Sequence, residues 1–323
     1  MSRRPPVAPT QKFKLKSEEE KDTVAELGEA VPPMRRGVDY SPLNWDSCWT
    51  RQEWLGQIPL YWTGEAGPVF VFMHGAGHSA MSFAKAAQLL TGARAVAFDF
   101  RGHGNNSQED PYNLEAQTLV QDSLTVLQHI KSQTGDSPVV LVGHSMGGAI
   151  ASKTGAAFQN SGGSLEGIIV LDVVEGSAID ALPHMDSIVR QRPRSFKSLE
   201  AAIQWHIESG TIKNLESARI SVPYLMTQQG SQWVWKTNLM RTKPYWEDWF
   251  RGMNDAFLSI EGAKQLMLAG SERIDKQMMI AQMQGKYKHT VVSDVGHVIQ
   301  EDNPERFVSE LQAFIDIFRI NTC

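Results

Sequence analysis

The stretch Gly143-His144-Ser145-Met146-Gly147 decides the fold of this chain. It follows the apolar run Pro138–Val142 and precedes Gly148–Ser152, whose small and apolar residues are typical of a helix. A strand that leads through G-x-S-x-G into a helix holds its serine on a tight turn, with the hydroxyl clear of the sheet. Glycine is needed on both sides because neighbouring backbone passes close to the turn. The sequence therefore predicts Ser145 as a nucleophile and the backbone N–H of Met146 as an oxyanion donor.

Strands and helices alternate on both sides of this turn. Apolar runs predict buried strands at 69–73, 95–99, 139–142 and 167–171, and an alternating segment from Trp54 to Trp62 predicts a hairpin at the sheet edge. Between the second and third of these strands, Ala116, Val120 and Leu124 recur with the period of a helix. Such continuous apolar strands indicate a parallel sheet that is covered by helices on both faces.

The alternation stops after Asp172 and resumes with a predicted strand at 265–269, a helix from about Asp275 and a strand at 290–292. Asn303 and Pro304 are typical of the start of a last helix. The predicted fold is an α/β-hydrolase fold: a mostly parallel central sheet with helices on both faces and a helical cap inserted after the sixth strand. We expect a mobile N-terminal tail at 1–38 and one domain at 39–323, with the cap at about 175–251.

A serine nucleophile needs a base and an acid that orients the base. His297 follows the last predicted strand in Asp294-Val295-Gly296-His297, which fits the chain order Ser, acid, His of this fold. The position of the candidates in the sequence does not by itself decide which residue is the acid. Asp172 ends the sixth strand, whereas Glu272 and Asp275 follow the seventh, which is the more usual place and favours Asp275.

The second oxyanion donor is expected in the turn His74-Gly75-Ala76-Gly77-His78, directly after a strand. Small residues there allow the N–H of Ala76 or Gly75 to approach a substrate carbonyl oxygen. A glycine-rich turn can also hold a dinucleotide phosphate, but this one meets only the looser pattern. That interpretation also leaves Ser145 and His297 without a role. The predicted chemistry needs neither a cofactor nor a metal ion.

Composition narrows the remaining function classes. The chain has 323 residues, 41% hydrophobic and 21% charged, with a net charge of -5. This balance gives no basic field for nucleic acid. Cys48 and Cys323 lack metal-ligand spacing, and the low cysteine count indicates a reducing compartment. The sequence shows no signal-like apolar segment and no apolar run of the roughly 20 residues that a membrane span needs. We therefore expect a cytoplasmic or nuclear protein without membrane contact.

Several segments outside the serine turn are more distinctive. They are 172–178 (DVVEGSA), 192–200 (RPRSFKSLE), 209–212 (SGTI), 214–219 (NLESAR), 245–246 (YW), 249–252 (WFRG) and Gly285. Together with the His74 turn and the run 143–150, they resemble the protein phosphatase methylesterase family. The resemblance extends from about Asp39 to Phe318.

The resemblance implies an activity and a partner. Members of this family hydrolyse the methyl ester on the C-terminal leucine carboxylate of the type 2A protein phosphatase catalytic subunit, so the implied partner is that subunit with its methylated tail. The resemblance also implies that the acid is Asp172. The chain departs from the family in one respect, because it runs directly from Val222–Met226 to Trp233 where relatives carry a long acidic insert. The departure leaves catalysis untouched but puts in doubt any partner contact that the insert would make.

Two other functions stay open: a general small-ester carboxylesterase, and a mainly non-catalytic protein that binds and inhibits the phosphatase. Aromatic residues crowd the end of the cap, and we expect most of them to fill the cap's own core. They are Trp233, Trp235, Tyr245, Trp246, Trp249 and Phe250. A basic cluster of Arg190, Arg192, Arg194 and Lys197 is a candidate for the site entrance. The specialised cap also raises the hypothesis that the triad forms only on docking.

Overall fold

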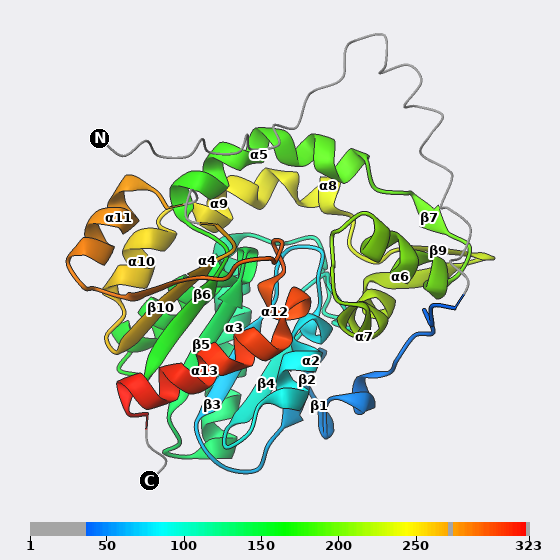
Figure 1. Cartoon of the computed structure of the whole chain (residues 1–323). Helices are drawn as coiled ribbons and strands as arrows, with labels where there is room; N and C mark the ends of the chain where they lie inside the picture. Colours follow the sequence, from blue (N-terminus) through cyan, green and yellow to red (C-terminus); the bar gives the residue numbers. More distant parts are fainter. Residues whose placement is uncertain (1–36, 271–273, 321–323) are drawn as a thin grey trace, which may run out of the picture.

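A computed structural model describes residues 37–270 and 274–320, and Figure 1 shows the whole chain. Its main sheet has eight strands in the order β1-β2-β4-β3-β5-β6-β10-β11. The strands are β1 (Arg51–Leu55), β2 (Ile58–Thr63), β3 (Val69–Met73), β4 (Arg94–Phe98), β5 (Val139–His144), β6 (Gly167–Leu171), β10 (Ala263–Leu268) and β11 (Lys288–Val291). β2 pairs antiparallel with β1 and with β4, and the other neighbours are parallel. The sheet is thus mostly parallel, as predicted.

The central strands are apolar along their whole length because both faces of the sheet are buried. In β3 the side chains of Val69 and Val71 pack into one core cluster, and those of Phe70 and Phe72 pack into another. This alternation follows from the two-residue period of a strand. Two buried faces require two layers of helices, which gives a three-layered domain.

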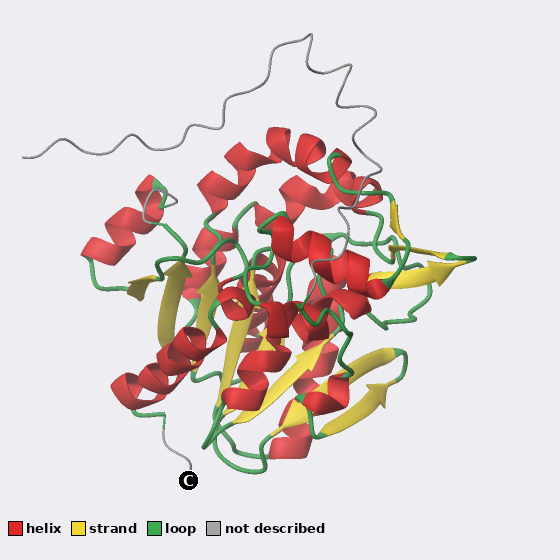
Figure 2. Cartoon of the chain, turned by 45° about the vertical axis from the view of Figure 1, so that its right-hand side comes forward, coloured by secondary structure: helices red, strands yellow, loops and turns green. Residues whose placement is uncertain are grey.

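Helices cover both faces of the sheet (Figures 1 and 2). They are α2 (Ala84–Leu89), α3 (Ala116–Thr134), α4 (Met146–Asn160), α10 (Met253–Ser259), α11 (Lys276–Met283), α12 (Ile299–Asp302) and α13 (Pro304–Phe318), with short 3-10 helices η2 (Trp45–Ser47) and η3 (Ala80–Phe83). α3, α4 and α10 pack on the first core cluster, and α2 and α13 pack on the second. In Figure 1, α2 and α13 lie in front of the sheet.

The predicted strands lie close to the observed ones. β3 and β6 have the predicted bounds, and the others begin or end within two residues of them. The predicted hairpin is present as β1 and β2, but only β1 lies at the sheet edge because β2 also pairs with β4. Of the predicted tail, residues 1–36 lie outside the described part of the chain. Within that part, no helix is both long and apolar enough to cross a membrane.

The segment between β6 and β10 forms the cap, which arches over the top and right of the sheet in Figure 1. Its elements are α5 (Glu175–Arg190), β7 (Ser195–Phe196), α6 (Leu199–Glu208), α7 (Leu215–Leu225), β8 (Met226–Gln229), β9 (Gln232–Trp235), α8 (Leu239–Thr242), η4 (Lys243–Tyr245) and α9 (Trp246–Phe250). The cap is therefore not purely helical. β7, β9 and β8 form a second, antiparallel sheet that stands apart from the main one in Figure 2.

The aromatic residues of the cap divide between two cores. Trp233 and Trp235 pack at the margin of a small cluster around α6, α7 and Phe196. Trp246, Trp249 and Phe250 instead belong to the first core cluster of the main domain, and Tyr245 packs against it. The expectation that most of the six fill the cap's own core is therefore wrong. The reason is that α9 lies on α4 and α5, where the cap rejoins the main domain.

Candidate active site

Ser145 lies at the tip of β5, on the turn into α4. Its backbone has a positive φ, with φ 53° and ψ -122°. The flanking glycines permit this turn, because a Cβ at Gly143 would lie 2.3 Å from the Gly147 carbonyl oxygen. A Cβ at Gly147 would lie 2.2 Å from the Met73 carbonyl oxygen. The turn is thus packed between its own helix and the end of β3, and the serine stands at the carboxyl edge of the sheet.

Asp172 and His297 meet at the same edge. Asp172 directly follows β6, its side chain is fully buried, and its Oδ2 lies 2.7 Å from His297 Nδ1. The other oxygen, Oδ1, accepts a hydrogen bond of 2.9 Å from the Ala269 N–H. A carboxylate can only accept, so Nδ1 of His297 carries the proton and Nε2 is free to act as a base. The His297 side chain is 48% exposed, so this base faces the solvent side of the site.

Asp275, the alternative acid, has a different environment. It is the N-cap of α11 and accepts from the Met278 N–H at 2.9 Å. Its second oxygen accepts from the Gly176 N–H at 3.0 Å and from Asn254 Nδ2 at 2.8 Å. It therefore fastens α11 to the start of the cap. The structure brings Asp172, and not Asp275, to His297. Glu272 lies outside the described residues.

His144, next to the nucleophile, holds the loop that carries His297. Its Nε2 lies 2.8 Å from the His297 carbonyl oxygen, and the two imidazole rings are 4.7 Å apart between centroids. Burial lowers the pKa of His144 well below its usual value, so the ring is neutral and Nε2–H donates to the carbonyl. This contact brings the His297 loop against the serine turn. Sequence reasoning excluded His144 as the base but did not predict that it holds the His297 loop.

The turn after β3 packs directly on the serine. A Cβ at Gly75 would lie 2.9 Å from His144 Nδ1 and 3.3 Å from Ser145 Cβ, so only glycine fits there without displacement. Ala76 follows it and is half-buried. On the other side, Met146 opens α4, and a first-turn N–H has no acceptor within its own helix. Both predicted sources of oxyanion donors thus flank Ser145.

Two buried polar groups hold this turn and the residues that follow it, and sequence reasoning missed the role of both. His74 Nε2 accepts from the Phe100 N–H at 3.0 Å, and its Nδ1–H donates to the Gly75 carbonyl at 2.8 Å. Asp99 accepts from the N–H groups of Ala80, at 2.7 Å, and Asn105, at 2.8 Å. Burial raises the pKa of Asp99 to about 6. The only sequence signal was their position at strand ends.

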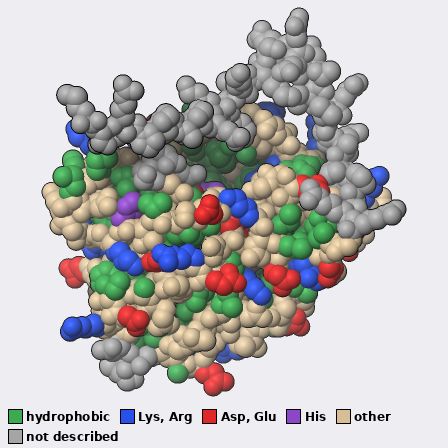
Figure 3. Space-filling view, viewed as in Figure 1, with side chains coloured by type: hydrophobic (Ala, Val, Ile, Leu, Met, Phe, Trp, Pro, Cys, Tyr) green, Lys and Arg blue, Asp and Glu red, His purple; other side chains and the backbone are tan. Residues whose placement is uncertain are grey.

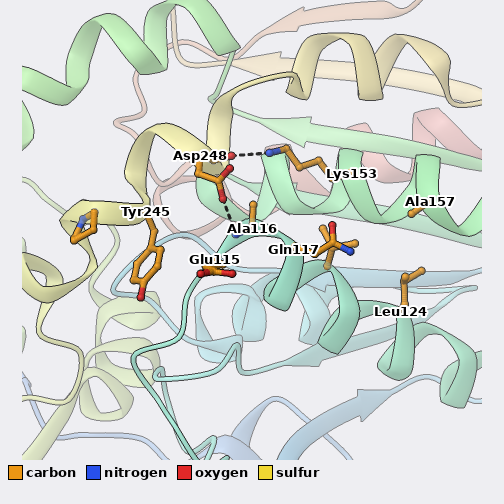
Figure 4. Close-up of a pocket in the computed structure, with 10 residues that line it drawn as sticks. Glu115, Ala116, Gln117, Leu124, Lys153, Ala157, Tyr245 and Asp248 are labelled. Carbon is orange, nitrogen blue, oxygen red and sulfur yellow. Dashed lines mark hydrogen bonds between the residues drawn. The ribbon is translucent and has the colours of Figure 1, made fainter.

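A pocket of about 710 Å³ lies between α3, α4 and the η4–α9 segment (Figure 4). Lys153 Nζ donates to the Asp248 carbonyl at 2.6 Å, and Asp248 Oδ2 accepts from the Ala116 N–H at 3.0 Å. None of Ser145, Asp172 and His297 lines this pocket. Lys153 is eight residues beyond Ser145, about 12 Å along α4. The pocket is therefore separate from the nucleophile.

Other features bear on what the site can bind. Among residues 37–270 and 274–320, no group of three or more His, Cys, Asp or Glu side chains is arranged to hold a metal ion. On the face shown in Figure 3, acidic and basic side chains are interspersed rather than separated by sign.

The predicted basic cluster does not act as one group. Arg190 pairs with Asp186 at 2.7 Å, and the Arg192 guanidinium lies 5.1 Å from the Trp235 ring centroid. Arg194 and Lys197 are exposed.

Comparison with protein families and solved structures gives consistent results. Residues 70–310 match the model of the alpha/beta hydrolase family. An E-2-(acetamidomethylene)succinate hydrolase superposes with a TM-score of 0.66 at 19% identity, over 82% of this chain and 98% of that one. An esterase from Mycobacterium tuberculosis superposes with a TM-score of 0.65 at 21% identity, over 94% of this chain and 100% of that one. At such low identity these structures bear on the fold alone.

Curated relatives are more similar. Protein phosphatase methylesterase 1 of Emericella nidulans is 43% identical over 281 residues, which cover 79% of this chain and 68% of the relative. The protein of that name from Mus musculus is 35% identical, over 87% of this chain and 86% of the relative. For the one from Cryptococcus neoformans, at 40% identity, the match covers 78% of this chain and 65% of the relative. This chain thus spans about two thirds of the length of some relatives.

Proposed function

The chain belongs to the alpha/beta hydrolase family and, within it, to the protein phosphatase methylesterases, and from this premise we propose that it is a serine carboxylic-ester hydrolase. The proposed substrate is the methyl ester on the C-terminal leucine of the type 2A phosphatase catalytic subunit. The observation that carries the proposal is the 2.7 Å contact between Asp172 and His297, at the sheet edge where Ser145 stands with a positive φ. We expect the enzyme to act in the cytoplasm or the nucleus.

The proposed mechanism starts with proton transfer from the Ser145 hydroxyl to His297 Nε2 as the oxygen attacks the leucyl carbonyl carbon. Asp172 stays ionised, orients the imidazole through Nδ1–H and stabilises the imidazolium that forms. The N–H groups of Met146 and of Ala76 or Gly75 stabilise the oxyanion, and one such donor contributes about 3 kcal/mol.

Collapse of the tetrahedral intermediate breaks the bond to the methoxy oxygen, and His297 protonates the departing methanol. Water then attacks the acyl-enzyme, with His297 again as base, and releases the free leucine carboxylate and Ser145. The chain's own residues supply every proton transfer in this sequence.

The test is methanol release from the carboxymethylated phosphatase catalytic subunit, with the native chain compared to Ser145→Ala. We expect release only with the native chain, and unchanged binding of the phosphatase by Ser145→Ala. Turnover of a simple aryl ester without methanol release would favour a general carboxylesterase. Binding with no turnover of either ester would favour the non-catalytic inhibitor.

A further inference from the structure

Glu301 is a buried carboxylate that the proposed mechanism does not use. It lies in α12, four residues after His297, and is 1% exposed. Burying a charged group is costly unless hydrogen bonds compensate for the lost water. His78 Nδ1 lies 3.5 Å from Oε1, but the two groups form an ion pair only when the imidazole is protonated, and this nitrogen makes no hydrogen bond with the described residues. Its compensation comes instead from two hydroxyl groups.

Those hydroxyls belong to different parts of the fold. Ser82 Oγ donates to Oε1 at 2.5 Å, and Ser221 Oγ donates to Oε2 at 2.5 Å. Ser82 lies in η3, directly after the oxyanion turn, and Ser221 lies in cap helix α7. Gln300 Nε2 donates to Ser82 Oγ at 2.8 Å and extends the network. One carboxylate thus joins the His297 loop, the oxyanion turn and the cap.

A row of imidazole rings leads from this carboxylate to the catalytic base. The ring of His78, at the end of the oxyanion turn, stands perpendicular to that of His144 with centroids 5.7 Å apart. His144 in turn contacts the His297 ring and donates to its carbonyl oxygen. The three rings are packed in sequence, so a displacement of His78 would be passed to His144 and to the backbone of His297.

We propose that Glu301 is a positioning residue of the active site. Its carboxylate accepts from Ser82 and so joins η3, which follows the oxyanion turn, to the loop that holds His297. By accepting from Ser221 it also holds cap helix α7 at the same point. Geometry of the oxyanion donors and of the base thereby depends on one buried side chain that touches neither substrate nor Ser145. This role is tested by measuring ester hydrolysis, so the inference rests on the proposed function.

The experiment uses the full chain with Glu301→Ala, Glu301→Gln and Ser82→Ala. Reactive Ser145 is counted by stoichiometric labelling with a fluorophosphonate, and kcat and KM for a small aryl ester are then expressed per reactive serine. A displacement of about 1 Å can cost about 100-fold in rate. We therefore expect kcat per reactive serine to fall about 10- to 100-fold in Glu301→Ala and several-fold in Ser82→Ala, with KM nearly unchanged. Glu301→Gln, which keeps the shape, should recover most of the loss.

Glu310→Ala is the matched control. Glu310 is also a buried carboxylate, but it bonds Lys288 at 2.8 Å and Gln265 at 3.1 Å, away from the serine turn. The Glu310→Ala substitution should lower the free energy of unfolding and leave kcat per reactive serine unchanged. If Ser82→Ala and Glu301→Ala behave like this control, Glu301 is only structural. If Glu301→Ala does not fold, an unchanged kcat in Ser82→Ala overturns the proposal by itself. A native chain that is neither labelled nor active would overturn the proposed function, and this assignment with it.

Discussion

Ser145 and Asp172 share an unusual backbone conformation. Both have φ slightly above 50°, a region that residues with a Cβ rarely adopt. Such a conformation costs on the order of 1–3 kcal/mol and persists only where the surroundings enforce it. Here the Ser145 N–H donates to the Leu171 carbonyl at 3.0 Å, and the Asp172 N–H donates to the Met267 carbonyl at 2.8 Å. The ends of β5, β6 and β10 are thus bonded in a row, which aims both side chains at the site.

Replacing Asp172 by Asn should nearly abolish turnover. The neutral amide cannot stabilise the imidazolium and can hold the wrong tautomer of His297, a change that costs about 10⁴-fold in a serine hydrolase. Asp275→Asn should leave most of the turnover and lower the free energy of unfolding by about 1 kcal/mol, because it weakens the contact to Gly176. Steady-state kinetics and denaturant unfolding of both variants check this. The opposite ranking of the two rates would make Asp275 the acid.

The sequence predicted individual site residues unequally well. Ser145 and His297 could be predicted because a turn motif and a strand end define them locally. Position alone favoured Asp275 over Asp172, whereas the structure brings Asp172 to His297. Each acid follows one of two adjacent strands, so a local pattern does not show which of them reaches the histidine. Glu301 was not predicted at all, because its role depends on Ser82 and Ser221, which are distant in the chain.

At the level of elements, the strands of the main sheet were predictable and those of the cap were not. A strand buried on both faces, such as Val69–Met73, is a continuous apolar run that stands out from its flanks. β7 has two residues, and β8 and β9 have four each, too few for any period to emerge. The packing of the cap side chains likewise depends on which helices they contact in the folded chain. No local sequence pattern shows these contacts.

The core of the cap should make the protein sensitive to acid. His206 is buried among Trp205 and Trp235, and its Nδ1–H donates to the Ala202 carbonyl at 2.8 Å. Burial lowers its pKa from 6.5 to about 3. Below pH 6.5, His206 therefore binds a proton in the unfolded chain but stays neutral in the folded chain. The free energy of unfolding consequently decreases as the pH falls from 6.5 towards 3.

The expected loss through His206 is about 1.4 kcal/mol for each pH unit within that window. His206→Phe keeps a ring in the core but cannot titrate, so its free energy of unfolding should fall less between pH 7 and pH 5. Exposed His184 offers a control, and His184→Gln should follow the native curve. Parallel curves for the native chain and His206→Phe would show that the cap histidine does not set the acid sensitivity.

For the whole molecule, docking of a large protein ester should be separable from the chemistry. Arg192 is unsuitable for a charge reversal because it packs on Trp235, but Arg194 and Lys197 are exposed on the same segment. Reversing both to Glu should raise KM for the methylated phosphatase several-fold, with an effect that shrinks at high salt, since rim charges mainly steer association. Kinetics on a small aryl ester should not change. An equal loss on both substrates would mean that the change disturbs the site itself.

The overall architecture was predictable because it follows from a few long-range regularities. The continuous apolar strands indicate a parallel sheet with two buried faces, and therefore two layers of helices. The long interruption of the strand–helix alternation after Leu171 indicates the position of the cap. The division of aromatic residues between two cores was not, because α9 returns to α4 rather than staying with α6 and α7.

The β8–β9 hairpin makes the cap tolerant of changes in length. Its turn at Gly230 is exposed and left-handed, and nothing lies within 4 Å of the position of an added Cβ. Residues grafted between Gln229 and Gln232 would leave and rejoin paired strands without crossing either core. Doubling such a loop costs only about 0.6 kcal/mol in closure entropy. Residues can therefore be added at this point at little cost, and an engineer could attach a fluorescent reporter there without touching the catalytic edge.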